Sequence, residues 1–149
     1  MEPLTAALLG GGTYYIASQI LSPRLTPHQV HALTQNWLCT VCTRNPAAVA
    51  SLYAPDGILV GTVAQRIKQT PAEIQTYFDT FLAKDGICGN VTSQMSQEYL
   101  GWAIDTGTYT FSWTENGNVV EVPARYTFVW RKTPHGWKIA NHHSSALPE

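Results

Sequence analysis

The feature that most constrains the fold is a change of periodicity near Asp85–Gly86. Before this point the apolar residues recur at helical spacing, and after it they alternate as they do in strands. The stretch "TPAEIQTYFDTFL" is the clearest helix, with Thr70 as its N-cap and Pro71 in the first helical position. Glu73 completes the pattern of a capping box, which satisfies backbone donors at a helix start. The sequence therefore predicts helices in the first half of the chain and a sheet in the second half.

The same signals predict the other elements. Thr26 begins a first helix with a capping box of its own, and Asn45 begins a short second helix that ends near 55–57. A hairpin is expected at Asn116–Gly117. The strands are expected over 58–62, roughly 89–104 with a break, 106–113, 119–132 and 137–145. Helices followed by consecutive antiparallel strands indicate an α+β fold, in which a curved sheet wraps around the helices and forms a cone with a pocket inside.

The composition restricts the domain organisation and the partners. We expect one domain over 26–149, preceded by a poorly structured N-terminal extension over 1–25. Hydrophobic residues make up 44 % of the chain and charged residues only 13 %, about half the usual share, which favours a covered surface and hence a homodimer. The net charge of −1 and the lack of any basic run argue against binding to nucleic acid or to a membrane surface.

The compartment is predicted from the cysteines and from the first residues. Three cysteines cannot all pair within one chain, and the chain is not a small disulfide scaffold, so a reducing compartment is expected. The opening stretch lacks the basic start of a secretory signal, and its glycines argue against a membrane span. The expected location is the cytoplasm, or an organelle stroma if a transit segment has been removed.

The final strand places two histidines and two serines side by side. Trp137 and Ile139 share one face and are expected to point toward the helices, which turns His143 and Ser145 inward as well. The opposite face carries Lys138, Ala140, His142 and Ser144. A bulge within the strand would reverse the assignment and turn the histidine and serine of this second face inward. The inward pair is the candidate for chemistry.

The histidines and cysteines do not favour a metal site. His142 and His143 are adjacent strand residues that point to opposite faces, so they cannot easily converge on one ion. Cys39 and Cys42 have the spacing of a metal or redox site, but they lie within a helix and are interpreted as small apolar residues. Cys88 has no evident partner. No cofactor is therefore expected, although manganese or zinc stays open.

Four segments together resemble a known family: "LYAPDGILVGT", "TPAEIQTYFDTFL", "VPARYTFVWRK" and "GWKIANHHSSALPE". In this order they resemble the cone-shaped SnoaL-like (nuclear-transport-factor-like) superfamily, and within it the association (hub) domain of calcium/calmodulin-dependent kinase II. They are most similar to the iota-class carbonic anhydrases, whose repeat ends in His-His-His-Ser-Ser followed by Met-Pro. The resemblance covers about residues 26–149. The chain departs from that pattern at Asn141, Leu147 and Gly61, where relatives tend to have histidine, methionine and proline.

The resemblance implies reversible hydration of CO2 to bicarbonate, without a bound metal in some members and with manganese in others. Carried over residue by residue, it implies a pocket in which Thr62, Tyr77, His143 and Ser145 act. The hydroxyl groups would position the attacking water and the CO2 oxygens, and the histidine would accept or relay the proton or orient a neighbouring hydroxyl.

Two other functions stay open. A hub-like module would assemble homo-oligomers without catalysing a reaction, and its pocket would be vestigial or would bind a small carboxylate. A small-molecule isomerase or cyclase of the same fold would need an acidic general base in its cavity. The acidic residues mostly fall at helix caps, turns and surfaces, which disfavours the isomerase: they include Asp56, Glu73, Asp85 and Glu115.

Overall fold

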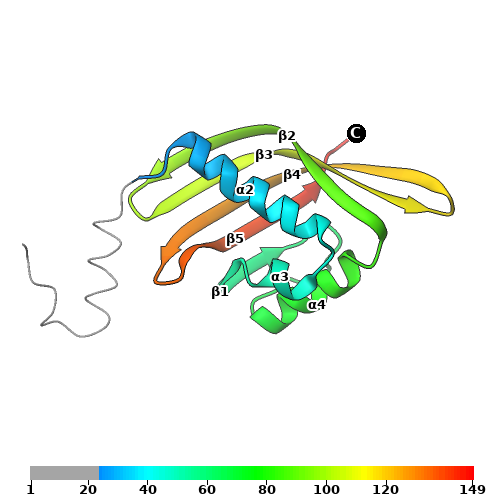
Figure 1. Cartoon of the computed structure of the whole chain (residues 1–149), viewed down its shortest axis with the longest axis horizontal. Helices are drawn as coiled ribbons and strands as arrows, with labels where there is room; N and C mark the ends of the chain where they lie inside the picture. The colour runs from blue at the N-terminus through cyan, green and yellow to red at the C-terminus, as the bar shows by residue number, and fades with distance from the viewer. Residues whose placement is uncertain (1–23) are drawn as a thin grey trace, which may run out of the picture.

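The structure is a computed structural model that describes residues 24–149, with three helices on one face of a single curved sheet (Figure 1). The expected extension over 1–25 lies almost entirely outside the described residues. The helices are α2 (Pro27–Cys42), α3 (Pro46–Ala50) and α4 (Pro71–Phe81). The strands are β1 (Tyr53–Val60), β2 (Asp85–Tyr99), β3 (Trp102–Glu115), β4 (Asn118–Thr133) and β5 (Gly136–Ala146). No helix in this described part is long and apolar enough to cross a membrane.

Each helix starts with a polar N-cap followed by a proline, as the sequence predicts, at Thr26, Asn45 and Thr70. The first helix has a complete capping box, because the Thr26 hydroxyl accepts from the Gln29 N–H and the Gln29 side chain accepts from the Thr26 N–H. In α4 the carboxylate of Glu73 instead accepts from the backbone of Gln69, one residue before the N-cap. These caps fix where α2 and α4 begin and so which side chains face the sheet.

The sheet has the strand order β1-β5-β4-β3-β2. Neighbouring strands run antiparallel except for β1 and β5, which are parallel. Figure 1 shows α2 crossing the sheet while α3 and α4 lie at one end of it. The core forms between the helices and this face of the sheet, around Trp37, Phe78, Tyr109 and Phe128, which are all almost fully buried. The predicted α+β cone is confirmed.

Two element boundaries differ from the prediction. The short second helix ends at Ala50, and Pro55–Gly57 lies within β1 instead of forming a turn. The division expected between the strands 89–104 and 106–113 is also displaced, because β2 and β3 are joined at Leu100–Gly101. The two-residue turns that are favoured between antiparallel strands contain a residue with positive φ, and Gly101 supplies it here with a φ of 73°. The alternating pattern alone did not locate this turn.

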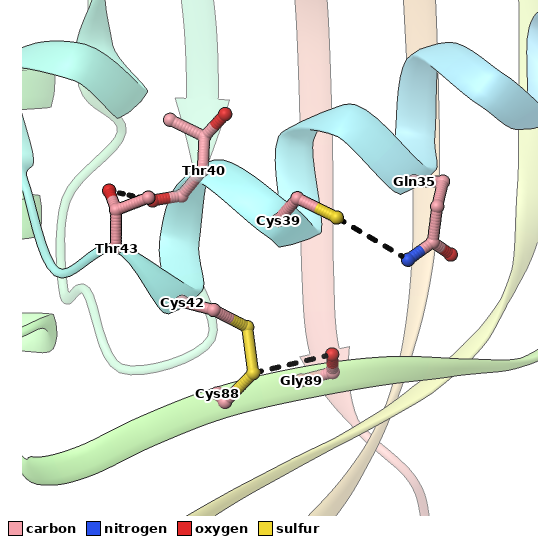
Figure 2. The surroundings of a disulfide bond; sticks show 7 residues. All are labelled: Gln35, Cys39, Thr40, Cys42, Thr43, Cys88 and Gly89. Carbon is pink, nitrogen blue, oxygen red and sulfur yellow. Dashed lines mark hydrogen bonds between the residues drawn. A yellow bond between two sulfur atoms is a disulfide. The ribbon is translucent and has the colours of Figure 1, made fainter.

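Cys42 and Cys88 form a disulfide that joins the end of α2 to the start of β2 (Figure 2). The expectation that Cys88 has no partner is therefore wrong. The two residues are 46 positions apart, and only their approach in the folded chain brings the sulfur atoms together. Cys39 remains a free, exposed thiol that accepts a hydrogen bond from Gln35. Disulfides persist mainly in oxidising environments, so this bond argues against the expected reducing compartment.

Candidate functional site

A bulge in β5 decides which histidine and serine face the interior. Ile139 pairs with Trp130 and Asn141 pairs with Val129, so Ala140 is an extra residue with no partner of its own in this register. An extra residue of this kind shifts the alternation of side chains between the two faces of a strand. The side chains beyond Ala140 therefore have the opposite orientation from that predicted by Trp137 and Ile139.

The expected inward orientation of His143 and Ser145 is wrong for this reason. His143 is exposed, and Ser145 lies on the outer face, where its hydroxyl accepts a hydrogen bond from Arg125 Nε at 3.0 Å. His142 and Ser144 are buried instead, with 2 % and 6 % of their surface exposed. The interior pair is thus His142 and Ser144, which the sequence analysis expected to face inward only if the final strand contained a bulge.

An inner cavity of about 10 Å³ lies beside the buried pair and has room for roughly one water-sized molecule. Thr62, directly beyond β1, and Tyr77, on α4, line this cavity, as expected for pocket residues. The other polar walls are Tyr109, His142 and Ser144, and the remaining walls are mainly aromatic. Hydroxyl groups and one imidazole thus converge in mostly apolar surroundings. The catalytic role assigned to Thr62 and Tyr77 stays a prediction.

The polar side chains form one continuous chain of hydrogen bonds. Tyr109 donates its hydroxyl hydrogen to Ser144 Oγ at 2.6 Å, and Ser144 Oγ lies 2.6 Å from Thr62 Oγ1. On the other side, Tyr109 Oη lies 3.3 Å from His142 Nε2, and Tyr53 Oη lies 2.8 Å from His142 Nδ1. Since Tyr109 uses its only hydrogen on Ser144, its oxygen accepts from Nε2–H. His142 Nδ1 is then the acceptor for the Tyr53 hydroxyl, which fixes the tautomer of the imidazole.

The surroundings of His142 keep the imidazole neutral. The ring stacks on Phe128, with ring centroids 3.9 Å apart, and meets the edge of Trp37 at 5.0 Å. Burial among these rings lowers the pKa of His142 to about 3, and the neighbouring His143 adds to the shift. At neutral pH His142 is therefore an uncharged imidazole, and its Nε2–H group donates to Tyr109 Oη.

Burial also keeps the tyrosines of the site protonated. It raises the pKa of Tyr109 far above its usual range, against the opposing effect of the hydrogen bond to Ser144. It raises the pKa of Tyr77 to about 12, although the backbone N–H groups of Val63 and Thr62 work in the opposite direction. Each phenol is therefore a neutral hydrogen-bond donor and acceptor at physiological pH.

Sequence reasoning missed Tyr53 and Tyr109. The predicted second helix extends to 55–57 and so includes Tyr53, whereas the structure places Tyr53 at the start of β1. Tyr109 shares a face of β3 with Ala103 and Phe111, and this apolar alternation marks it as an inward-facing residue. Tracing that alternation along β3 would have identified Tyr109, whereas the placement of Tyr53 needed the tertiary fold.

A second buried polar cluster, which the sequence does not predict, surrounds Asp105. Asp105 is fully buried on β3, and its Oδ2 accepts hydrogen bonds from Thr34 Oγ1 at 2.5 Å and from Gln94 Nε2 at 3.0 Å. Burial raises the pKa of this carboxyl, although the hydrogen bonds from Thr34 and Gln94 oppose the shift. Asp105 is not among the residues that line the inner cavity, so this cluster is separate from the hydroxyl chain.

The described part of the chain contains no group of three or more His, Cys, Asp or Glu side chains that could hold a metal ion. The donors that converge on the inner cavity are hydroxyl groups and one imidazole. Divalent ions are held mainly by several carboxylates, imidazoles or thiolates together, so this set is a poor match for a metal centre.

Comparison with solved structures places this fold among known relatives. The chain is similar to a Xanthomonas campestris protein described as a calcium/calmodulin-dependent protein kinase II association domain, with 42 % identity over 81 % of this chain and 87 % of that one, and a TM-score of 0.77. It has the fold of a Streptomyces avermitilis protein described as a dehydratase of the nuclear-transport-factor-2-like family, with 19 % identity, 83 % and 96 % coverage, and a TM-score of 0.72. A ketosteroid isomerase-like protein from Erwinia carotovora atroseptica shares the fold with 18 % identity, 83 % and 97 % coverage, and a TM-score of 0.68.

The fold is therefore of the nuclear-transport-factor-2-like class, in which a curved sheet encloses helices. A search of curated proteins finds no match to the sequence. The profile of the calcium/calmodulin-dependent protein kinase II association domain matches residues 26–148, which is most of the chain. Together with the 42 % identity to the Xanthomonas protein, this match shows that the chain belongs to the calcium/calmodulin-dependent protein kinase II association-domain family.

Proposed function

We propose that the protein is a carbonic anhydrase that works without a bound metal, with the attacking water in the inner cavity and CO2 admitted beside it by a small movement of the cavity walls. The observation that carries the proposal is the row of hydroxyls Tyr109, Ser144 and Thr62, joined by two hydrogen bonds of 2.6 Å beside a small, largely apolar cavity. Such groups can bind a water and polarise a CO2 oxygen with little reorganisation, because the fold already holds them in place. The sequence resemblance to the iota class supports the same reaction.

The neutral imidazole determines how protons would move. With a pKa of about 3, His142 cannot hold the proton that the attacking water releases at neutral pH. A concerted relay avoids this difficulty. The water oxygen bonds to the carbon of CO2, the water passes a proton to a serine or threonine hydroxyl, and that hydroxyl passes its own hydrogen to a CO2 oxygen. The product is carbonic acid, which ionises to bicarbonate after it leaves the cavity.

In this mechanism Ser144 and Thr62 contact the reacting water, and His142 and Tyr109 are positioning residues. The His142 N–H group fixes the direction in which Tyr109 donates, and Tyr109 in turn orients the Ser144 hydroxyl. A pocket of neutral donors stabilises developing charge less than a divalent ion does, so turnover is expected to be modest compared with zinc enzymes.

The test is stopped-flow CO2 hydration by metal-stripped protein, with elemental analysis of the same sample. Ser144→Ala should lower kcat/KM by about 100-fold, the usual cost of removing one positioned donor. Ser145→Ala is the matched control, since it removes the same hydroxyl one residue away on the outer face. Equal rates for these two variants would remove Ser144 from the mechanism. Absence of CO2 hydration by the native protein, with or without added Mn²⁺ or Zn²⁺, would refute the anhydrase proposal.

The family match favours a second candidate, a homo-oligomerisation module that forms at least a homodimer. The matched family is described by its association domain, and the low share of charged residues agrees with a covered surface. This role does not need the hydroxyl chain, so Ser144→Ala should leave assembly intact. Sedimentation velocity at several concentrations measures the assembly, and a monomer at all of them would exclude this function.

An isomerase or cyclase needs an acidic general base at the substrate, and Asp105 is a buried acid in this fold. Its carboxylate is bound by Thr34 and Gln94 and lies outside the walls of the inner cavity. A substrate in that cavity would not meet it, and we do not propose this function.

A further inference from the structure

The backbone of Gly61 lies against the ring of Tyr77. A Cβ atom added to Gly61 would lie 2.5 Å from Cε2, 2.6 Å from Cζ and 2.8 Å from Oη of Tyr77. Carbon atoms do not approach this closely without a shift of one of them. Gly61 is not among the glycines with positive φ, so its backbone would accept an alanine. The ring of Tyr77, and not the backbone conformation, is what requires glycine here.

Tyr77 forms a wall between two hollows. On one side lies the inner cavity of about 10 Å³, and on the other an open depression of about 350 Å³ lined by the 63–68 segment and by α4. Tyr77 belongs to the walls of both. Its ring stacks on Phe81, with centroids 5.7 Å apart, and meets Phe78 edge to face at 5.1 Å. The ring is thus held between the phenylalanines of α4 and the bare backbone of Gly61.

The outer depression is large enough to receive a displaced ring, whereas the inner cavity is not. A side chain at position 61 would therefore move Tyr77 outward and join the two hollows. We propose that Gly61 and Tyr77 together set the size limit of the inner cavity. At rest the cavity holds about one water molecule, a small shift of the Tyr77 ring admits a molecule of two or three non-hydrogen atoms such as methanol or CO2, and larger molecules are rejected. The inference rests on the proposed function in placing CO2 in this cavity, but the size limit itself is independent of catalysis.

The size limit can be measured without relying on catalysis, by NMR of the His142 imidazole in protein labelled with ¹⁵N-histidine. Methanol is the small probe, and phenol is the large probe, because it matches the ring that Tyr77→Ala removes. In the native protein the His142 signals should shift with methanol and stay unmoved by phenol. In Gly61→Ala and in Tyr77→Ala they should shift with both. Tyr99→Ala, which truncates an exposed tyrosine outside both hollows, should behave as the native protein does.

The double variant tests whether Gly61 acts through Tyr77. Once Tyr77 is alanine, the substitution at position 61 has no ring to displace, so Gly61→Ala should add no further response to phenol. This comparison, with Tyr77→Ala alone, also keeps the test decisive if the single Gly61→Ala variant fails to fold. An added response in the double variant would show that position 61 acts by another route and would overturn the coupling.

CO2 hydration measured on the same samples separates the two proposals. A native protein that hydrates no CO2 but distinguishes methanol from phenol refutes the anhydrase function and leaves the size limit standing. A native protein whose His142 signals respond equally to both probes refutes the size limit, whatever its activity. The size limit would also be refuted if both single variants, Gly61→Ala and Tyr77→Ala, still responded to methanol and not to phenol.

Discussion

The Cys42–Cys88 disulfide closes a long loop between the end of α2 and the start of β2, and removing it should lower the stability of the fold. The two cysteines are 46 residues apart. In the chain-entropy treatment, a cross-link of that span restricts the unfolded chain by about 4 kcal/mol at 25 °C. This is a large part of the roughly 5–15 kcal/mol that stabilises a typical domain. Cys42→Ala with Cys88→Ala removes the bond, and both residues are half-buried, so little packing is lost.

Urea unfolding followed by circular dichroism measures the effect. With a slope of about 2 kcal/mol per molar urea, the loss should move the unfolding midpoint down by roughly 2 M. Cys39→Ser is the matched control, because it removes the exposed free thiol and leaves the bond in place. A thiol titration of denatured, unreduced native protein should detect one free cysteine.

Two results would contradict this reasoning. Three free thiols in the unreduced native protein would show that Cys42 and Cys88 are not bonded, and the reducing compartment would again be the better expectation. A double variant whose midpoint matches that of Cys39→Ser would show that the bond does not restrict the unfolded chain as the loop length requires.

Three further predictions concern buried groups. The unfolded chain protonates His142 below about pH 6.5, whereas the folded protein does so only near pH 3. The contribution of His142 to the free energy of unfolding should therefore decrease as the pH falls across that window, by at most about 1.4 kcal/mol per pH unit. His142→Gln should flatten this slope in urea titrations at pH 4 to 7, and an unchanged slope would contradict the burial argument. Gly107→Ala should destabilise the fold by about 3 kcal/mol, since its Cβ would lie 1.9 Å from the backbone oxygen of Ser93; a thermal midpoint equal to that of the native protein would show that the strands can separate there. Because the pKa of Asp105 is raised in the folded protein, the stability that its protonated carboxyl contributes is lost as the pH rises above the pKa of the unfolded carboxyl. Asp105→Asn should therefore be more stable relative to the native protein at pH 7 than at pH 4. The opposite trend in the same urea titrations would show that a charged Asp105 stabilises the fold.

Local sequence signals determined much of this fold, because they act between residues close in the chain. The capping residues Thr26 and Thr70 place two helix starts, since a hydroxyl satisfies backbone donors within the same turn. The alternation of apolar residues identified the strands, and the order of helices and strands identified the α+β class. The family resemblance, and no local signal, implied Thr62 and Tyr77 as pocket residues, and both line the inner cavity.

Contacts between distant segments decided the rest. The extra residue Ala140 is visible only in the pairing of β5 with β4, and it exchanges His143 and Ser145 for His142 and Ser144 at the interior. Tyr53 reaches His142 across 89 residues of sequence, and Cys42 reaches Cys88 across 46. The local sequence pattern does not reveal a single-residue shift in strand register, yet such a shift reverses the orientation of every side chain beyond it. The sequence by itself therefore determined which residue types would meet in the cavity, and only the tertiary structure decided which individual residues they are.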